Sequence, residues 1–251
     1  MKKHKICKIL LVILAIFLCV AFYELLGICV AYKKQPEVSN TTKKETKNGS
    51  WNECSENTER AVIIEKNPEA LLQRVRLIKN AKKEIILSTF AFQSDESGKL
   101  ILGALHDAAD RGVHIRLLVD GMESWIDMEG NPYFYGLSSH ENVEIKLYNK
   151  ANPLKPWKMM GRMHDKYLIA DGKRYILGGR NTYNYFLGDF PGHKNYDRDV
   201  LVVCDEPEKE NSVNQLLEYF ETIWEQEDSD YFHDNKKLAN RKSVKNAVLE
   251  L

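Results

Sequence analysis

The stretch HDKYLIADGKRYILGGRN, residues 164–181, predicts two short β-strands joined by a turn at Asp171 and Gly172. Alternate residues of an extended strand face the same way, so His164 and Lys166 are expected to project together. Histidine attacks or transfers protons near neutral pH, and lysine stabilises negative charge. The first half of the stretch therefore predicts a site for chemistry on an anion.

The second half of the stretch adds groups that suit a phosphoryl ligand. Gly178 and Gly179 let the backbone come close to a ligand or to a facing strand, and Asn181 offers a neutral amide donor. Each residue also has an ordinary explanation; Asp171, for example, is both a turn residue and a motif position. The full pattern, H-x-K-x4-D-x6-G-G-x-N, rarely arises by accident.

Outward from this stretch, strand-like and helix-like segments alternate along the chain. Strands are expected at 61–65, 84–92, 113–121, 142–148, 164–171, 173–179 and 199–205. Helices are expected at 68–83, 95–112 and 212–226, each with apolar residues at helical spacing. This alternation is typical of an α/β domain whose central sheet is covered by helices.

With these flanks, the stretch resembles the signature of the phospholipase D superfamily. The segments SDESGKLILGALHDAADRGVHIRLLVDG (94–121) and YDRDVLVV (196–203) are similar to those around the motif in bacterial cardiolipin synthases, so the resemblance covers about residues 61–225. It implies a phospholipase D-like layered domain at 60–228, with a central mixed β-sheet flanked by helices. It also implies a two-step transfer through a phosphohistidine, which water or a second alcohol then resolves.

The resemblance assigns roles to five residues of the motif. His164 matches the family histidine, as the nucleophile or as its acid/base partner. Lys166 and Asn181 match the groups that hold the phosphate oxygens, and Gly178 and Gly179 belong to the same phosphate-binding segment. No metal ion or cofactor is expected.

Acidic residues complete the expected catalytic set. Asp171 is included because it is a motif position. Family members also have an acid after the motif that hydrogen-bonds the histidine, which fixes the tautomer and supports the imidazolium form. Asp199 is the best positional match, Asp197 is the alternative, and a plain surface acid is the competing explanation.

The N-terminal region predicts a membrane anchor. Residues 1–8 are basic, residues 9–32 are apolar apart from Glu24, and residues 33–59 form a polar tether. Twenty-four helical residues span about 36 Å, and the hydrocarbon core of a bilayer is about 30 Å thick. A cleavable signal peptide is the alternative, but no convincing cleavage site follows the apolar run. The preceding positive charge favours a single-pass cell-membrane protein with its catalytic domain outside the cytoplasm.

Charge and cysteine content narrow the choice of partners. Residues 1–50 hold nine lysines and three acids, so the remainder, with 27 basic and 33 acidic residues, has a net charge of −6. Nucleic acid is therefore an unlikely partner. Cys54 and Cys204 have a spacing that neither requires nor forbids a disulfide, and no metal-ligand spacing is present. Residues 229–251 look like a polar tail or linker.

A single copy of the motif is present, whereas family active sites use two. The second copy is expected from a symmetric homodimer or from a second half of a longer enzyme. The leading hypothesis is a membrane-anchored, cardiolipin synthase-like enzyme that transfers phosphatidyl groups from a phosphatidylglycerol-like phospholipid. The alternatives are a homodimeric nuclease or other phosphodiesterase, and an inactive membrane scaffold with half a site.

Overall fold

The computed structural model describes residues 2–33, 38–41, 43–44, 59–206, 211–233 and 236–251. The chain divides into a smaller unit, residues 1–55 with 151–161, and a larger unit, residues 56–150 with 162–251. Cys54 and most of the expected tether lie outside the described residues, so the possible Cys54–Cys204 disulfide stays a prediction.

The larger unit is built on an eight-stranded mixed sheet, which confirms the expected fold class. Along the sheet the strands are β1 (Glu59–Ile64), β7 (Asp199–Cys204), β6 (Arg174–Gly178), β5 (Tyr167–Ala170), β2 (Glu84–Thr89), β3 (His114–Asp120), β4 (Val143–Tyr148) and β8 (Ser229–Tyr231). The β2–β3 and β3–β4 pairs are parallel, and the other pairs are antiparallel.

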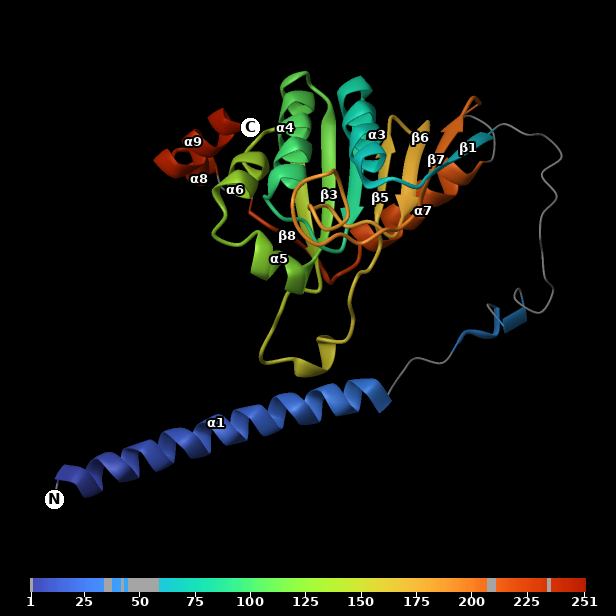
Figure 1. Cartoon of the computed structure of the whole chain (residues 1–251). Coiled ribbons are helices and arrows are strands. Elements are labelled where there is room, and N and C mark those ends of the chain that lie inside the picture. The colour runs from blue at the N-terminus through green and yellow to red at the C-terminus, as the bar shows by residue number, and fades with distance from the viewer. Residues whose placement is uncertain (1, 34–37, 42, 45–58, 207–210, 234–235) are drawn as a thin grey trace. The chain divides into compact units, whose positions relative to one another are not determined.

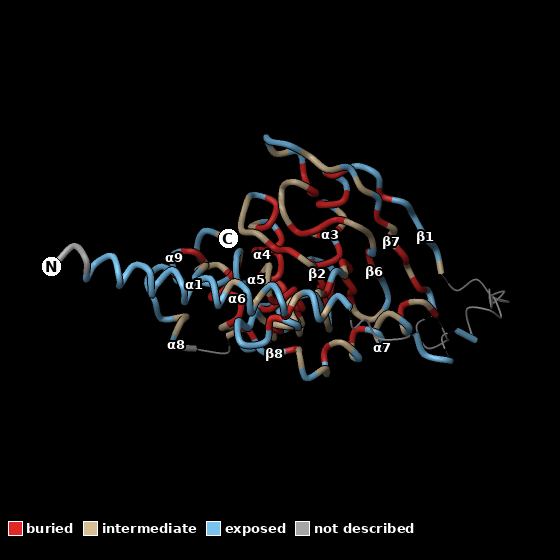
Figure 2. Tube along the Cα trace, turned by 90° about the horizontal axis from the view of Figure 1, so that it is seen from below, coloured by how far each residue is buried: buried red, intermediate tan, exposed pale blue. Residues whose placement is uncertain are grey.

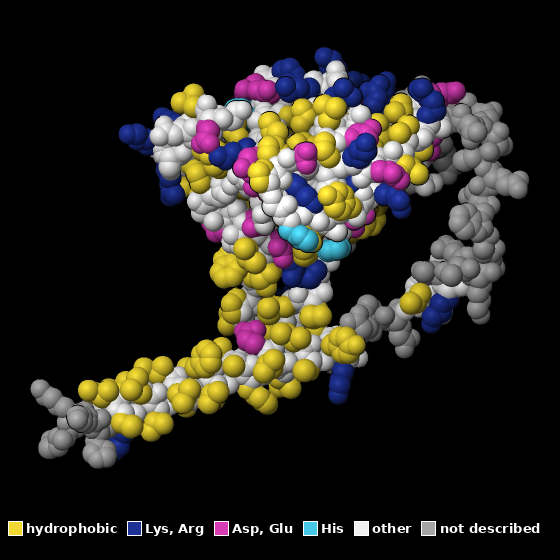
Figure 3. All heavy atoms as spheres, in the orientation of Figure 1, with side chains coloured by type: hydrophobic (Ala, Val, Ile, Leu, Met, Phe, Trp, Pro, Cys, Tyr) yellow, Lys and Arg dark blue, Asp and Glu magenta, His cyan; other side chains and the backbone are white. Residues whose placement is uncertain are grey.

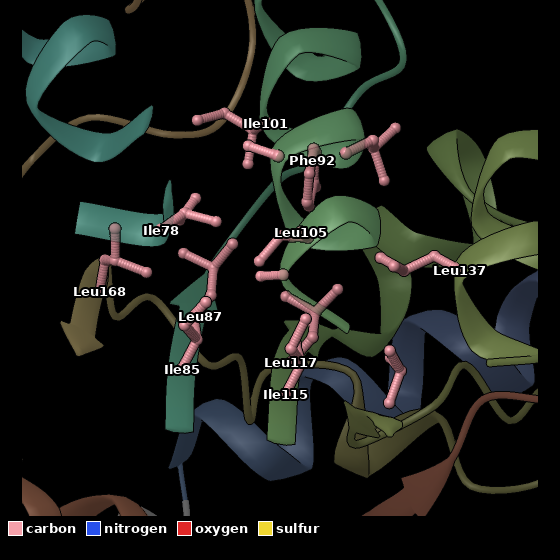
Figure 4. Close-up of a cluster of buried hydrophobic side chains, with 14 of the residues drawn as sticks. Ile78, Ile85, Leu87, Phe92, Ile101, Leu105, Ile115, Leu117, Leu137 and Leu168 are labelled. Carbon is pink, nitrogen blue, oxygen red and sulfur yellow. The ribbon is translucent and has the colours of Figure 1, made fainter. Parts of the chain in front are cut away.

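Helices cover both faces of this sheet (Figure 1). On one face lie α3 (Asn67–Asn80), α4 (Glu96–Asp110) and α6 (Pro132–Ser138). Figure 4 shows their core, where Ile101 and Leu105 of α4 meet Leu117 of β3 and Leu87 of β2. On the other face α7 (Ser212–Trp224) buries its apolar side, including Phe220, against the sheet. Each fully buried side chain of this kind contributes about 1.5–3 kcal/mol.

Local sequence explains where these elements begin and end. The carboxylate of Asp95 accepts a hydrogen bond from the Gly98 N–H (3.0 Å) and so caps the start of α4. The chain leaves this helix through Gly112, whose φ of 85° is readily adopted only by glycine. Two short helices, α5 (Gly121–Asp127) and α6, were not expected, because seven residues are too few to give a clear helical period.

The C-terminal segment differs from the expected polar tail. Strand β8 pairs with β4, and α9 (Lys242–Glu250) buries Val244 and Ala247. Val248 lies so close to Gly136 of α6 that a Cβ at the glycine would overlap it. Residues 229–233 and 236–251 are thus part of the folded unit, and the described elements run past the expected boundary at 228. The few apolar residues of β8 and α9 do not form a pattern in the sequence that identifies them as core residues.

The smaller unit contains α1 (Lys2–Lys33) and the short helix η1 (Pro156–Lys158). Within the described ranges, α1 is the one helix long and apolar enough to cross a membrane. Most of its side chains are exposed, as the pale blue of Figure 2 shows. An exposed apolar surface of this length is typical of a helix that lies in lipid.

Candidate active site

The motif residues gather at one edge of the sheet. Strand β5 begins beside the end of β2, since Ser88 pairs with Tyr167. Strand β6 ends beside the start of β7, since Gly178 pairs with Asp199. The residues just before β5 and β7 and just after β2 and β6 therefore meet at this edge, although more than a hundred positions separate the end of β2 from the start of β7.

His164 lies in the extended segment that precedes β5. The residue is exposed, and its ring packs edge-on against Phe90, with the ring centroids 4.5 Å apart. Partial burial of the imidazole and the nearby Lys166 cation lower the pKa of His164 below its ordinary value of 6.5. The lowered pKa favours the neutral imidazole, which is the form that acts as a nucleophile.

Lys166 supplies a buried positive charge next to that imidazole. The residue is only 5% exposed, and its Nζ donates to the backbone oxygen of His164 at 2.7 Å. Nζ also lies over the Phe90 ring, 5.3 Å from its centroid. Burial lowers the pKa of Lys166, while the carboxylates of Asp165 and Asp197 oppose the shift. Because water is partly excluded, this cation interacts more strongly with an anion than an exposed lysine would.

Asn181 completes the group of donors. The side chain is buried, and its Oδ1 accepts a hydrogen bond from the Ala91 N–H at 3.3 Å. This bond orients the amide so that Nδ2 is the group left to donate to a ligand. The structure thus brings His164, Lys166 and Asn181 to one edge of the sheet.

The two glycines of the motif lie against two carboxylates, one at the start of β7 and one just before it. A Cβ at Gly178 would overlap Asp199 Oδ1, and a Cβ at Gly179 would overlap the carboxylate of Asp197. Neither glycine has a φ that demands glycine. The close approach of a carboxylate is thus a sufficient reason for each glycine, and the expected contact of this segment with a phosphate stays a prediction.

Asp199 is not placed as expected. Its side chain is fully buried, and Oδ2 pairs with Arg74 Nη1 at 2.8 Å and with Arg180 Nη1 at 3.2 Å. Asp199 Oδ1 is also buried and finds no hydrogen-bond partner among the residues that the structure describes. Its known partners are thus arginines, and no contact with His164 is seen in the described part of the chain.

Asp197 is the acid on the open side of the cluster. It is only half-buried, its carboxylate lies against Gly179, and it is one of the charges that act on Lys166. Arg180 donates to the backbone oxygen of Asp197 and so fixes this acid in place. The structure therefore favours the alternative, Asp197, over Asp199 as the site carboxylate.

Asp171 lies at the other end of β5. It is five positions along the chain from Lys166, a distance of about 16 Å at about 3.3 Å per residue. Its carboxylate accepts hydrogen bonds from the backbone N–H groups of Lys82, Lys83 and Glu84, at 2.7–3.1 Å. The structure thus does not bring Asp171 to the site, and it gives the motif aspartate a role in fixing the start of β2 instead.

Two features of the site were not predicted. Phe90 provides an aromatic wall for both His164 and Lys166, but an aromatic residue after a strand is too common to single out. Asp120 accepts bonds from Arg162 Nε at 2.9 Å and from the Met163 N–H at 3.1 Å, which fixes the backbone just before His164. The sequence signal for Asp120 was an acidic residue at the end of a buried strand, directly before a glycine.

In the described part of the chain, no three His, Cys, Asp or Glu side chains converge to hold a metal ion. A sequence model of the family described as "Cardiolipin synthase, PLD-like domain" matches residues 74–224. The chain belongs to the phospholipase D-like (PLD-like) family. The matched range contains every motif residue discussed above.

Two curated bacterial proteins are similar in sequence to this PLD-like chain. It is 31% identical to an uncharacterized protein of Helicobacter pylori strain J99 over 206 residues, which cover 76% of the chain and 38% of that protein. It is 29% identical to cardiolipin synthase C of Escherichia coli K12 over 171 residues, covering 62% and 34% respectively. The PLD-like chain thus spans between a third and two fifths of the length of these relatives.

A solved structure shares the fold of the PLD-like chain. The phospholipase D family member Nuc of Salmonella typhimurium superimposes with a TM-score of 0.50 at 20% identity. The match covers 70% of the chain described here and 99% of Nuc. A family member with a single unit of this size therefore has the same fold.

Proposed function

We propose that the chain is a membrane-anchored enzyme that cleaves or transfers the phosphodiester group of a phospholipid. The observation that carries the proposal is the meeting of three groups: an accessible imidazole of lowered pKa (His164), a buried ammonium (Lys166) and a free amide donor (Asn181). Together they supply a nucleophile and two donors for the oxygens of a phosphate.

The first step forms a bond between a ring nitrogen of His164 and the phosphorus. The bond from phosphorus to the leaving alcohol oxygen breaks as the new bond forms. Lys166 Nζ and Asn181 Nδ2 stabilise the charge that builds up on the non-bridging oxygens. Donors of this kind typically contribute a factor of about 100–1,000 each to the rate.

The leaving oxygen needs a proton, which a second imidazole supplies. In the second step that imidazole takes a proton from water or from an acceptor alcohol, whose oxygen attacks the phosphorus and breaks the bond to His164. Because one motif is present, the second imidazole comes from the His164 of another copy or from another half of a longer protein. The coverage of 99% of Nuc supports the first source, and the greater length of the curated relatives supports the second.

The substrate class follows from the anchor and the relatives. Helix α1 is long and apolar enough to hold the chain at a bilayer, where phospholipid is the abundant phosphodiester. A relative is named cardiolipin synthase C, which supports a phosphatidylglycerol-like donor. The placement of the catalytic domain outside the cytoplasm stays a prediction from the basic N-terminus.

Acid-quenched turnover tests this proposal. The full-length chain in vesicles is mixed with phosphatidylglycerol labelled at phosphorus, and label on the protein is measured. We expect labelled protein and lipid turnover, both lost in His164→Ala and both retained in His193→Ala, which removes an exposed imidazole of the same unit. Cleavage of DNA without lipid turnover would indicate the nuclease alternative. Absence of both activities in an oligomeric protein would indicate the scaffold.

A further inference from the structure

The segment 151–161, which ends three residues before His164, packs on helix α1 (Figure 1). Tyr23 Oη of α1 donates a hydrogen bond to the backbone oxygen of Leu154 at 3.0 Å. One turn further along the helix, Gly27 contacts Pro156 at the start of η1. Both segments belong to the smaller unit, so this packing is a property of that unit alone.

The helix has a surface shaped for this segment. Gly27 is buried, and a Cβ there would lie 2.5 Å from Pro156 Cγ and 2.8 Å from Pro156 Cβ. Ile28 and Ala31, on the same helical face, are half-buried, whereas Leu25 and Leu26 are more than 50% exposed. Small residues that let a backbone approach are typical of packing within membranes. The covered face is confined to the last third of α1.

The other side of the segment is apolar and exposed. Leu154, Trp157 and Met160 are 78%, 46% and 50% exposed, while Pro156 between them faces α1. Figure 3 shows hydrophobic side chains, in yellow, along most of α1. A helix in lipid thus carries a second apolar segment that is not covered by any other described part of the protein.

We infer that residues 151–161 insert into the interfacial layer of the bilayer beside α1 and hold the reacting histidine at the lipid surface. The inference rests on the proposed membrane-anchored lipid activity and adds the surface that reaches the substrate. The apolar run of α1 ends at Tyr32, so Tyr23 and Gly27 lie toward the end of a span of about 30 Å. Tyrosine and tryptophan favour this level of the membrane, and Lys155 suits anionic headgroups.

The covalent link to the site gives this insertion a function. Three residues lead from Gly161 to His164, and an extended chain covers at most about 3.6 Å per residue. The Cα atom of His164 therefore lies within about 11 Å of the Cα atom of Gly161. A phosphodiester in the same membrane then meets the nucleophile without leaving the bilayer.

An engineered disulfide tests the packing on α1. In a chain whose native cysteines are replaced by serine, Gly27→Cys is combined with Pro156→Cys, because their Cβ positions are 2.8 Å apart and a shift of about 1 Å brings them to the spacing of a disulfide. The matched control combines Leu14→Cys with Pro156→Cys, since Leu14 lies about 20 Å away along the helix. We expect mild oxidation in membranes to cross-link most of the first protein and little of the second. Equal cross-linking of the two pairs would overturn the inference.

Depth-dependent quenching tests the insertion. A polarity-sensitive fluorophore is attached at Leu154→Cys, and at Leu72→Cys of α3 as the exposed control, in vesicles of phosphatidylglycerol and phosphatidylcholine. We expect lipids spin-labelled near the headgroup to quench the label at 154 and not the label at 72. A label at 154 that is quenched only by a water-soluble quencher would refute insertion.

Neither measurement depends on catalysis. A protein that cross-links and is quenched, yet never turns over phospholipid, retains this inference and loses the proposed function. A protein that turns over phospholipid with its segment in water retains the function and loses the inference.

Discussion

Asp199→Asn separates a structural acid from a catalytic one. The substitution keeps the size of the side chain but removes the negative charge that faces Arg74 and Arg180, whose side chains are 5% and 0% exposed. Breaking a buried ion pair in this way costs about 3–5 kcal/mol, because a buried charge loses its partner. Folded domains are stable by only about 5–15 kcal/mol, so the loss is large.

The assay is urea unfolding of the full-length chain in detergent, followed by tryptophan fluorescence. With a slope of about 2–3 kcal/mol per M, the midpoint should fall by about 1.5 M. Asp205→Asn is the matched control, since Asp205 pairs with Arg60 at the surface and both side chains are more than half exposed. Its midpoint should stay close to that of the unchanged protein.

The opposite pattern would refute this reasoning. If Asp199→Asn unfolded at the wild-type urea concentration and lost lipid turnover, Asp199 would be acting on the histidine. The buried pairs with Arg74 and Arg180 would then add no net stability.

Three further results are expected. The pKa of the His164 imidazole, measured by NMR titration and assigned with His164→Asn, should lie below 6.5. The fall of kcat/KM at acidic pH should occur at the same pKa. A pKa above 6.5 would contradict the effect of burial and of Lys166. Gly179→Ala should lower kcat by up to about 100-fold, because the new methyl group displaces the carboxylate of Asp197, whereas normal turnover would exclude Asp197 from the site. Asp171→Ala should lower the free energy of unfolding, measured in urea, by about 1–3 kcal/mol, and the folded protein should retain lipid turnover. Unchanged stability with loss of turnover would instead indicate a catalytic role for Asp171.

The sequence was sufficient to predict the central sheet and the edge that carries the site. Alternating strand and helix patterns identified seven of the strands, because each contains a short run of apolar residues bounded by polar or turn residues. The short strand β8 and helix α9 were missed, since Val244 and Ala247 become recognisable as core only beside α6. Helix α5 was missed because its apolar Trp125 and Ile126 point outward.

Within the site, the sequence indicated the donors better than the acids. His164, Lys166 and Asn181 come together because the pairing of β5 with β2 and β6 places their neighbours side by side. The choice between Asp197 and Asp199 depends instead on which carboxylate faces the buried arginines. Arg74 lies 125 positions away from Asp199, so local spacing contains no information about that contact.

Arg180, inside the motif, also bears on the order of folding. Its guanidinium binds the backbone oxygens of Ile64 and Glu65, at the end of β1, and that of Asp197, just before β7. These partners lie 116, 115 and 17 positions away, and contacts between distant positions form slowly. A nascent chain that has just completed the motif still lacks β7 and therefore has no fixed acid. The position of the site acid is therefore fixed only once β7 has been made, long after residues 2–33 of α1.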